Sequence, residues 1–156
     1  MIHYVKGNLL DSNCDYICHQ VNCQGVMGSG IARQIRERWP EVYEGYKRFC
    51  EYYNTRDESL LGKVMITNRG CPMRIANLFS QDTYGYDGMR YTSYDAFAHC
   101  LITLKEHVPD DCTIGFPKNI GCGLGGGNWK VISALIEEIL GEDYEVYIYE
   151  YEPEED

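Results

Sequence analysis

The sequence predicts one α/β domain in which a six-stranded sheet carries helices on both faces. Segments with strand character alternate with segments of helical periodicity, and this order favours a sheet that is covered on both sides. The chain has 156 residues, enough for one domain with its own apolar core. No repeat or linker divides it. We therefore expect a single domain over residues 1–151 and a short acidic tail over 152–156.

The first half of the chain is expected to hold two strands and two helices. Residues 2–6 and 16–22 are short apolar runs typical of strands. Residues 31–39 place apolar side chains on one helical face, and Ser29 is a suitable N-cap for this helix. Pro40 ends that helix and can begin the next one at its first turn.

The second half is expected to hold four strands and two helices. Residues 62–67 and 74–79 predict two strands, and the short turn between them allows an antiparallel hairpin, which would make the sheet mixed. A polar, aromatic loop over 80–93 follows. The remaining elements are a helix capped by Thr92 or Ser93, a strand over 112–117, a helix with apolar residues from 129 to 139, and a strand over 144–151.

Composition and charge exclude several classes of protein. The formal net charge is −10, which argues against tight binding to a nucleic-acid backbone. No apolar run is long enough for a transmembrane helix, and the start of the chain lacks the pattern of a signal peptide. We therefore expect a cytoplasmic protein that works without a membrane, as a monomer.

The eight cysteines are expected to be mostly reduced, with several of them buried. They occur singly, without C-x-x-C pairs and without the Cys/His spacing of a zinc finger. A disulfide scaffold and a zinc site remain as alternatives. We expect neither a metal nor a cofactor.

Two glycine-rich segments share one arrangement. "NCQGVMGSG" (22–30) and "NIGCGLGGG" (119–127) each follow a predicted strand and precede a predicted helix. The unpaired N–H groups and positive dipole of a helix N-terminus bind phosphate without Lys or Arg. Two such loops at strand ends would flank one crevice and could hold a diphosphate. The alternative for each loop is a glycine turn that lets helix and sheet pack closely.

Two nucleotide-binding motifs are excluded. Gly121, Gly123 and Gly126 spell G-x-G-x-x-G, but this run leaves room for only one strand after it, so a Rossmann fold is rejected. A P-loop is rejected because no G-K-[ST] ends the run.

The chain resembles the macrodomain family over nearly its whole length, from Tyr4 to Tyr149. The stretches that carry the resemblance are "YVKGNLL", "VNCQGVMGSGIARQI" with "WPEVYEGY", "LLGKV" and "IGCGLGGGNW". The most similar branch contains ADP-ribose-1''-phosphate phosphatases and terminal ADP-ribose glycohydrolases. The resemblance implies a three-layer α/β/α fold with an ADP-ribose cleft at the carboxyl ends of the strands.

The resemblance also implies roles for individual residues. Asn8, which stands where the family often has an Asp, and Leu9 and Tyr149 fall near the adenine. Asn22, Phe79 and Ser80 fall beside the distal ribose. Two loops would wrap the diphosphate, the first with Gly28, Ser29, Gly30 and Ile31, and the second with Gly121, Cys122, Gly123, Leu124, Gly125 and Gly126.

Two departures from the glycohydrolase branch affect the expected chemistry. That branch uses a Lys nucleophile where this chain has Gln81, and an Asp where it has Gly125. A lysyl adduct needs an amine, which glutamine lacks. We therefore do not transfer that mechanism, and Gln81 is kept as a ligand-binding residue.

His19, Asn22 and Asp87 are the catalytic candidates. The imidazole of His19 could activate water for attack on a terminal phosphate or on the anomeric carbon. Its alternative is a strand histidine that is hydrogen-bonded inside the core, since strand alternation puts His19 and Asn22 on opposite faces. Asp87, like Asp82, could orient a water molecule or could be an ordinary loop acid.

These features predict an ADP-ribose-binding macrodomain that acts as a hydrolase at the distal ribose. The substrate would be ADP-ribose-1''-phosphate or an ADP-ribosylated macromolecule. The alternatives are a non-catalytic module that reads ADP-ribose and a binder of another nucleotide. Calorimetry and product analysis distinguish them.

Overall fold

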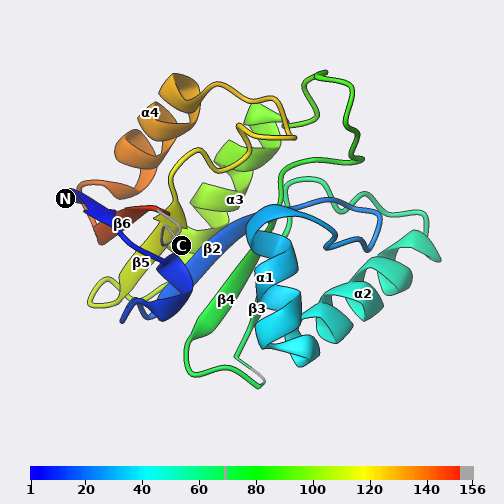
Figure 1. Ribbon diagram of the computed structural model, residues 1–156, viewed down its shortest axis with the longest axis horizontal. Coiled ribbons are helices and arrows are strands. Elements are labelled where there is room, and N and C mark those ends of the chain that lie inside the picture. The colour runs from blue at the N-terminus through cyan, green and yellow to red at the C-terminus, as the bar shows by residue number, and fades with distance from the viewer. Residues whose placement is uncertain (69, 152–156) are drawn as a thin grey trace, which may run out of the picture.

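The computed structural model describes residues 1–68 and 70–151, so the predicted tail over 152–156 lies outside the described residues. A six-stranded sheet runs through the centre of this part of the chain in the order β1-β6-β5-β2-β4-β3 (Figure 1). All neighbouring pairs are parallel except β3 and β4, so the expected mixed sheet with an antiparallel hairpin is confirmed. The strands are β1 (Ile2–Lys6), β2 (Tyr16–Val21), β3 (Val64–Thr67), β4 (Arg74–Phe79), β5 (Thr113–Pro117) and β6 (Glu145–Glu150).

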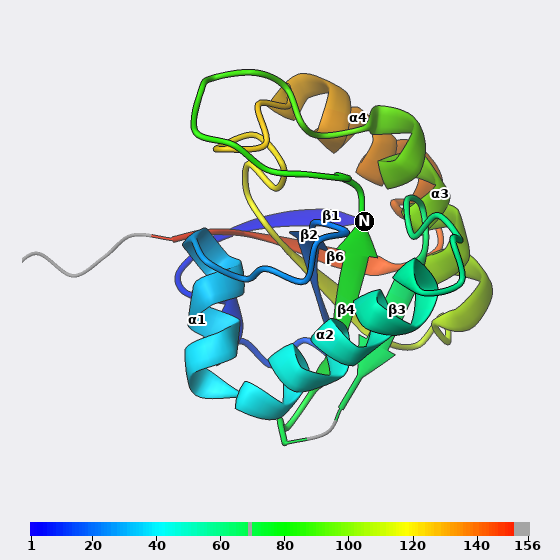
Figure 2. The same cartoon turned by 90° about the vertical axis from the view of Figure 1, so that its right-hand side faces the viewer.

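Four α-helices cover the sheet on both faces and confirm the three-layer α/β/α fold. Helices α1 and α2 lie on one face, and α3 and α4 lie on the other (Figure 2). A short 3-10 helix, η1, follows β1. The helices are η1 (Leu9–Asp11), α1 (Gly30–Arg38), α2 (Pro40–Asn54), α3 (Tyr94–His107) and α4 (Trp129–Leu140).

The helix starts follow from local hydrogen bonding. Ser93 caps α3, because its side chain accepts from the N–H of Ala96 at 3.2 Å. Asn128 caps α4 in the same way. Pro40 stands at the first position of α2, where a missing N–H costs nothing. Ser29 does stand at the N-cap of α1, but its side chain makes no capping bond, so the start of α1 is left open.

Strand alternation assigns apolar side chains to the two layers. On β2, Cys18 contributes to the cluster under α3 and α4, whereas Ile17 and Val21 belong to two separate clusters under α1 and α2. A polar pair, His19 and Asn77, faces across β2 and β4 at the register position between these two clusters.

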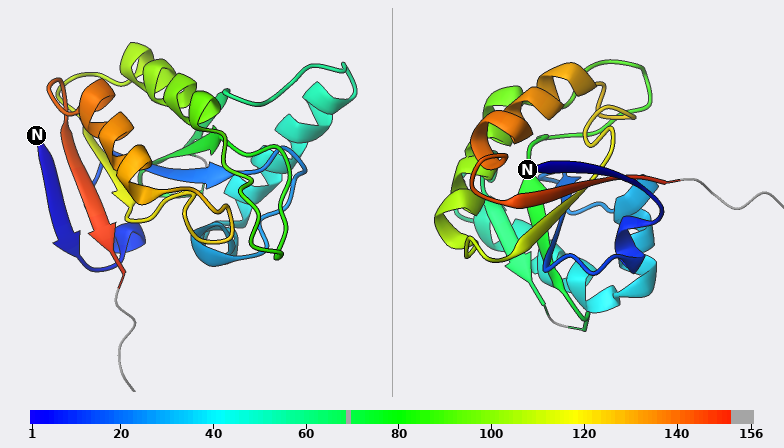
Figure 3. Two further views of the ribbon diagram at one scale, coloured as in Figure 1. Left: turned by 90° about the horizontal axis from the view of Figure 1, so that it is seen from above. Right: turned by 90° about the vertical axis from the view of Figure 1, so that its left-hand side faces the viewer.

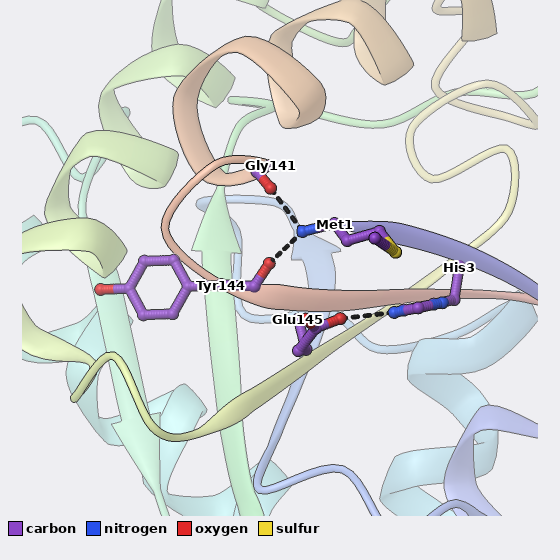
Figure 4. A network of polar contacts seen from close by, with 5 residues as sticks. All are labelled: Met1, His3, Gly141, Tyr144 and Glu145. Carbon is purple, nitrogen blue, oxygen red and sulfur yellow. Dashed lines mark hydrogen bonds and ion pairs between the residues drawn. The ribbon is translucent and has the colours of Figure 1, made fainter.

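The start of β1 is fastened to the connection between α4 and β6 (Figure 4). The amino group of Met1 donates to the carbonyls of Gly141 and Tyr144, the latter at 2.7 Å. Beyond it, the imidazole of His3 contacts the carboxylate of Glu145. These contacts hold the outermost parallel strand in register.

Three further expectations concern membrane spans, cysteines and metal sites. None of the helices that the structure describes combines the length and hydropathy that a membrane crossing requires. All eight cysteine thiols are free, and five of them are buried, at positions 14, 18, 23, 50 and 100. In the residues that are described, no cluster of His, Cys, Asp and Glu could hold a metal ion.

Replacing Gly115 with Ala should destabilise the protein, because η1 packs directly on β5. A Cβ atom at Gly115 would lie 2.6 Å from Cδ1 of Leu9 and 2.9 Å from Sγ of Cys14, both in the core. Overpacking of this kind lowers the free energy of unfolding by about 1–3 kcal/mol. Denaturant unfolding of Gly45→Ala is the matched control, since only the flexible end of Met65 approaches that Cβ position. Equal stability of the two variants would contradict this packing.

Candidate functional site

A cleft opens where β2 and β5 diverge. The two strands pair only through Tyr16 with Ile114 and Ile17 with Gly115, whereas β2 pairs with β4 along its whole length. Toward their carboxyl ends, β2 and β5 therefore separate. The two glycine loops (22–30 and 119–127) and the segment 80–93 gather at this end of the sheet (Figure 3). Ligands in open α/β sheets bind at such a place.

The cleft has two adjoining parts. The first, here called the tyrosine part, has a volume of about 100 Å³ and is lined by Asn22 and Val26 of the first loop and by Tyr84 and Tyr86. The second, the second-loop part, has a volume of about 430 Å³ and extends along residues 117–125. The two share the side chains or backbone of Gln20, Ser29, Ala32, Gln81 and Leu124.

The first glycine loop presents unpaired backbone donors to the cleft. The N–H groups of residues 28–32 donate to no acceptor within the described residues, and the first bond of α1 runs from the N–H of Arg33 to the carbonyl of Ser29. No carboxylate belongs to the first turn of the helix. The positive end of α1 therefore has no acidic side chain in its own first turn, an arrangement that favours anions.

The second glycine loop folds on itself and also leaves donors open. The backbone N–H groups of residues 122, 126 and 127 donate to the carbonyls of residues 119, 123 and 121, respectively, and close three small turns. The N–H groups of residues 121 and 123–125 have no acceptor in the part of the chain that the structure describes. Both loops thus offer main-chain donors on the same cleft.

The physical reason for having glycine differs between positions of the second loop. Gly121, Gly125 and Gly126 allow close packing, since added Cβ atoms would lie 2.6–2.7 Å from Gln20, Thr92 and Met89 respectively. Gly123 differs, because no atom lies within 4 Å of its Cβ position and its φ is not in the left-handed region. The fold therefore does not require glycine at position 123, which lines the cleft.

Gln20 ties the segments around the cleft together, and the sequence analysis did not single it out. Its Nε2 donates to Gln81 Oε1 at 2.6 Å and to Thr92 Oγ1 at 2.9 Å, and its Oε1 accepts from Ser80 Oγ at 2.6 Å. Thr92 Oγ1 in turn donates to the carbonyl of Gly121 at 2.7 Å. The sequence gives one indication of this role: Gln20 is a polar residue on the same face of the predicted strand as Asn22.

Asn22 lines the tyrosine part, but its amide holds the first loop. Its Oδ1 accepts from the N–H of Gln24 at 3.0 Å and from the hydroxyl of Tyr46 at 2.9 Å, while its Nδ2 donates to the carbonyl of Val26 at 2.8 Å. Only 7% of the residue is exposed. Asn22 therefore shapes the loop that borders the cleft.

His19 lies inside the sheet and does not reach the cleft. It is fully buried, and its Nε2 donates to Asn77 Oδ1 at 2.6 Å. Burial lowers the pKa of His19 to about 4, against which the bond to Asn77 has a smaller, raising effect. Its Nδ1 has no partner among the described residues. The structure thus separates His19 from Asn22. The position of His19 matches the alternative given above, a strand histidine that is hydrogen-bonded inside the core.

Asp87 lies on the 80–93 segment away from the lining of the cleft. Its carboxylate accepts from the hydroxyl of Tyr91 at 2.8 Å and from the N–H of Met89 at 3.1 Å. Both bonds lower the pKa of Asp87, and the bond from Tyr91 has the larger effect. The carboxylate therefore braces its own loop.

The other expected ligand-binding residues divide into two groups. The cleft is lined by Gln81 and by residues 28–31, 121 and 123–125. Gly126 is not part of this lining, because it packs against Met89. Four expected side chains instead point into the protein: Leu9, Phe79 and Ser80 are buried, and Cys122 packs on the cluster under α3 and α4.

Two residues expected near the adenine lie beyond the second-loop part. Asn8 caps η1, because its side chain accepts from the N–H of Leu10 at 3.0 Å. Tyr149 pairs with Pro117 across β5 and β6, and Pro117 lines the cleft. Tyr149 is therefore next to the far end of the cleft.

Ionisable groups are scarce around the cleft. The described lining of the tyrosine part contains no Lys, Arg, His, Asp or Glu, and its ionisable groups are the phenols of Tyr84 and Tyr86. In the second-loop part, Lys118 is the charged residue of the described lining, and its Nζ lies 3.6 Å from Glu150. An anion in the cleft would therefore be held mainly by backbone N–H groups.

Comparisons with known proteins show what the chain is similar to, although no family model matches it. The DNA ADP-ribosyl glycohydrolase of Mycobacterium tuberculosis is 39% identical over 96% of this chain and 42% of its own length. The ADP-ribose 1''-phosphate phosphatase of Scheffersomyces stipitis is 34% identical over 53% of this chain and 57% of its own. The solved macrodomain of Thermus aquaticus DarG is 28% identical with a TM-score of 0.76, covering 98% of this chain and 99% of that one. The chain spans about two fifths of the curated glycohydrolases it matches.

Acidification should destabilise the protein through His19. Its pKa is lower in the folded state than the usual 6.5, so the unfolded chain takes up the extra proton first as the pH falls. We expect the free energy of unfolding to fall between about pH 6.5 and pH 4, by on the order of 3 kcal/mol more in the wild type than in His19→Gln. Denaturant curves at several pH values measure this, with exposed His107→Gln as the control. Parallel pH profiles of the wild type and His19→Gln would contradict the assignment.

Proposed function

Because this chain belongs to the macrodomain family, we propose that it binds ADP-ribose in its cleft and hydrolyses a bond at the distal ribose. The observation that carries the proposal is the pair of open amide sets, over residues 28–32 and at residues 121 and 123–125, on one cleft. A diphosphate between them would accept from both loops, as phosphates do at helix starts and in glycine loops.

The charge of the protein supports a main-chain site of this kind. A net charge of −10 repels anions in general, and few cationic side chains line the described cleft. Local N–H groups and the dipole of α1 can still attract a diphosphate at short range. Glycine at position 123, which the fold does not require, would let a ligand approach the backbone closely.

The relatives' printed names support hydrolysis at the distal ribose. In this arrangement the diphosphate would fix the ribose over the tyrosine part, where the amides of Asn22 and Gln81 lie. Cleavage at the anomeric carbon passes through a positively charged, oxocarbenium-like state, which the nearby diphosphate would stabilise. Gln81 is held by bonds to Gln20 and to the carbonyl of Thr83, so its role is to position the ligand, not to attack it.

A second candidate function is a reader that binds ADP-ribose without cleaving it. The observation that favours it is the tyrosine part itself, whose described lining offers no carboxylate or imidazole to act as general acid or base. Product analysis separates the two functions. We expect release of free ADP-ribose from ADP-ribosylated DNA or from ADP-ribose-1''-phosphate, and binding without any product would establish the reader.

Gly123→Val should weaken ADP-ribose binding without unfolding the protein. The added side chain has room in the folded chain but would fill the space where the diphosphate approaches the loop. We expect the Kd measured by calorimetry to rise at least about tenfold, while the melting temperature changes by no more than about 2 °C.

Ala134→Val is the control for this variant, because it adds bulk on the exposed side of α4 outside the cleft. It should leave the Kd for ADP-ribose unchanged. Wild-type affinity in Gly123→Val would reject the placement of the diphosphate, and no binding of ADP-ribose to the wild type would reject the proposed function.

A further inference from the structure

Gln81 stands at the junction of the two parts of the cleft. It follows the end of β4, and it belongs to the lining of both the tyrosine part and the second-loop part. Its side chain is partly exposed there. With a diphosphate in the second-loop part and the ribose over the tyrosine part, a group at this junction lies close to the bond that joins the ribose to its substituent.

The direction of the hydrogen bonds around Gln81 is fixed from both ends. At one end, the hydroxyl of Thr92 donates its hydrogen to the carbonyl of Gly121, so Thr92 Oγ1 can only accept from Gln20. At the other end, the carbonyl of Thr83 can only accept, so it faces Nε2 of Gln81. The bond between the two amides then runs from Gln20 Nε2 to Gln81 Oε1. Neither amide can turn over without placing two donors or two acceptors against each other.

This order leaves Gln81 with one free acceptor and one free donor. Its Oε1 has two lone pairs, and the bond from Gln20 at 2.6 Å uses one of them. Its Nε2 has two hydrogens, and the bond to the carbonyl of Thr83 at 2.7 Å uses one of them. Within the described residues, this amide makes no further hydrogen bond. The free lone pair therefore belongs to a side chain that lines the cleft and that its neighbours hold in one orientation.

The amide of Asn22, which also lines the tyrosine part, cannot take the same role. Its Oδ1 already accepts from the N–H of Gln24 at 3.0 Å and from the hydroxyl of Tyr46 at 2.9 Å, and these bonds occupy its two lone pairs. The Ser and Tyr hydroxyls of this lining make no side-chain hydrogen bond to the part of the chain that the structure describes, so nothing there fixes their direction. Gln81 is thus the amide of the tyrosine part that can accept from a ligand or a water molecule in a fixed direction.

Gln20 is the anchor of this arrangement. Both hydrogens of its Nε2 are used, by Gln81 Oε1 and by Thr92 Oγ1, and its Oε1 accepts from the buried Ser80 at 2.6 Å. Gln20 therefore has no hydrogen left to donate to a ligand. Its influence on a bound ligand passes through Gln81.

We propose that Gln81 orients the water that attacks the anomeric carbon, and that Gln20 is a positioning residue that holds Gln81 for this step. The inference rests on the proposed function, because it requires an ADP-ribose derivative that is bound by the two glycine loops. The free lone pair of Gln81 Oε1 accepts from one hydrogen of the water, which turns the oxygen of the water toward the ribose. A glutamine can orient an attacking water in this way without forming a covalent adduct.

The step balances without a proton acceptor in the protein. Water forms the new C–O bond at the anomeric carbon while the bond from this carbon to the leaving atom breaks, and the electron pair of that bond stays with the leaving atom. A carboxamide does not take up a proton at neutral pH, so the proton that the water loses goes to the leaving group. Gln81 therefore contributes orientation, which suits a tyrosine part whose described lining holds no carboxylate or imidazole.

The test is a double-mutant cycle in which kcat and Kd are followed separately. The variants are Gln81→Met, Gln20→Met and the two together, each of which removes an amide but keeps a side chain of similar length. Gln34→Met makes the same change on α1, outside the described lining of the cleft, and is the matched control. Both ADP-ribose-1''-phosphate and an ADP-ribosylated oligonucleotide serve as substrates for kcat, and ADP-ribose is the ligand for Kd.

Thermal melts show which variants are folded at the assay temperature. Gln20→Glu replaces Gln20→Met in the cycle where the latter does not fold. It keeps an acceptor for Ser80 and removes the two hydrogens that hold Gln81 and Thr92.

Gln81→Met should lower kcat by about ten- to a hundredfold, while the Kd for ADP-ribose changes by less than about threefold. Gln20→Met should lower kcat by a similar factor. The double variant should lose no more than about threefold beyond Gln81→Met alone, because the two amides act as one unit. A purely structural role of Gln20 would instead multiply the two losses. Gln34→Met should keep wild-type values.

Each contrary result has a distinct meaning. Normal cleavage by the wild type together with unchanged kcat in Gln81→Met would overturn this inference alone, and losses that multiply in the double variant would overturn the action of Gln20 through Gln81. Binding of ADP-ribose without cleavage of either substrate would establish the reader and overturn the inference. A wild type that does not bind ADP-ribose would overturn the proposed function as well.

Discussion

The cleft depends on the side-chain amide of Gln20, which bridges the gap that opens between β2 and the second glycine loop. One amide group bonds to Ser80, Gln81 and Thr92, and Thr92 passes the connection on to Gly121. Because Ser80 and Thr92 are almost completely buried, these bonds form away from competing water. Losing Gln20 would leave Ser80 Oγ with a bond of 3.5 Å to the carbonyl of Leu78 and would remove the link from β2 to Thr92. Thr92 would still bond to Gly121 and Gly125 of the second loop.

This constraint explains why the cleft can be both rigid and nearly neutral. The side-chain amide of Asn22 bonds to the backbone of the first loop, and that of Gln20 connects to the second loop through Thr92. Neutral amides therefore hold both loops in place, without charged pairs. The backbone donors that remain unpaired are then the strongest polar features of the cleft. His19 and Asn77 extend the same use of neutral hydrogen bonds into the sheet, where a charged imidazole would be costly.

Much of the fold could be predicted from the sequence, whereas only part of the site could. Periodicity and glycine spacing gave the order of strands and helices and the two loops, because these depend on local physics. Side-chain direction depends on packing between distant elements. Cys122 and Ser80 follow the expected motifs but point inward, and Asp87 bonds within its own loop. Strand alternation did separate His19 from Asn22. It also puts Gln20 on the same strand face as Asn22, but no motif marks Gln20 as a residue of the cleft.

The central claim is that main-chain N–H groups of both glycine loops hold one diphosphate. Amide NMR of the ¹⁵N-labelled protein, titrated with ADP-ribose and separately with adenosine, tests it most directly. ADP-ribose should shift the amide resonances of residues 28–32 together with those of residues 121 and 123–125, and adenosine should leave both sets in place. Shifts confined to one loop, or equal shifts with adenosine, would contradict the claim.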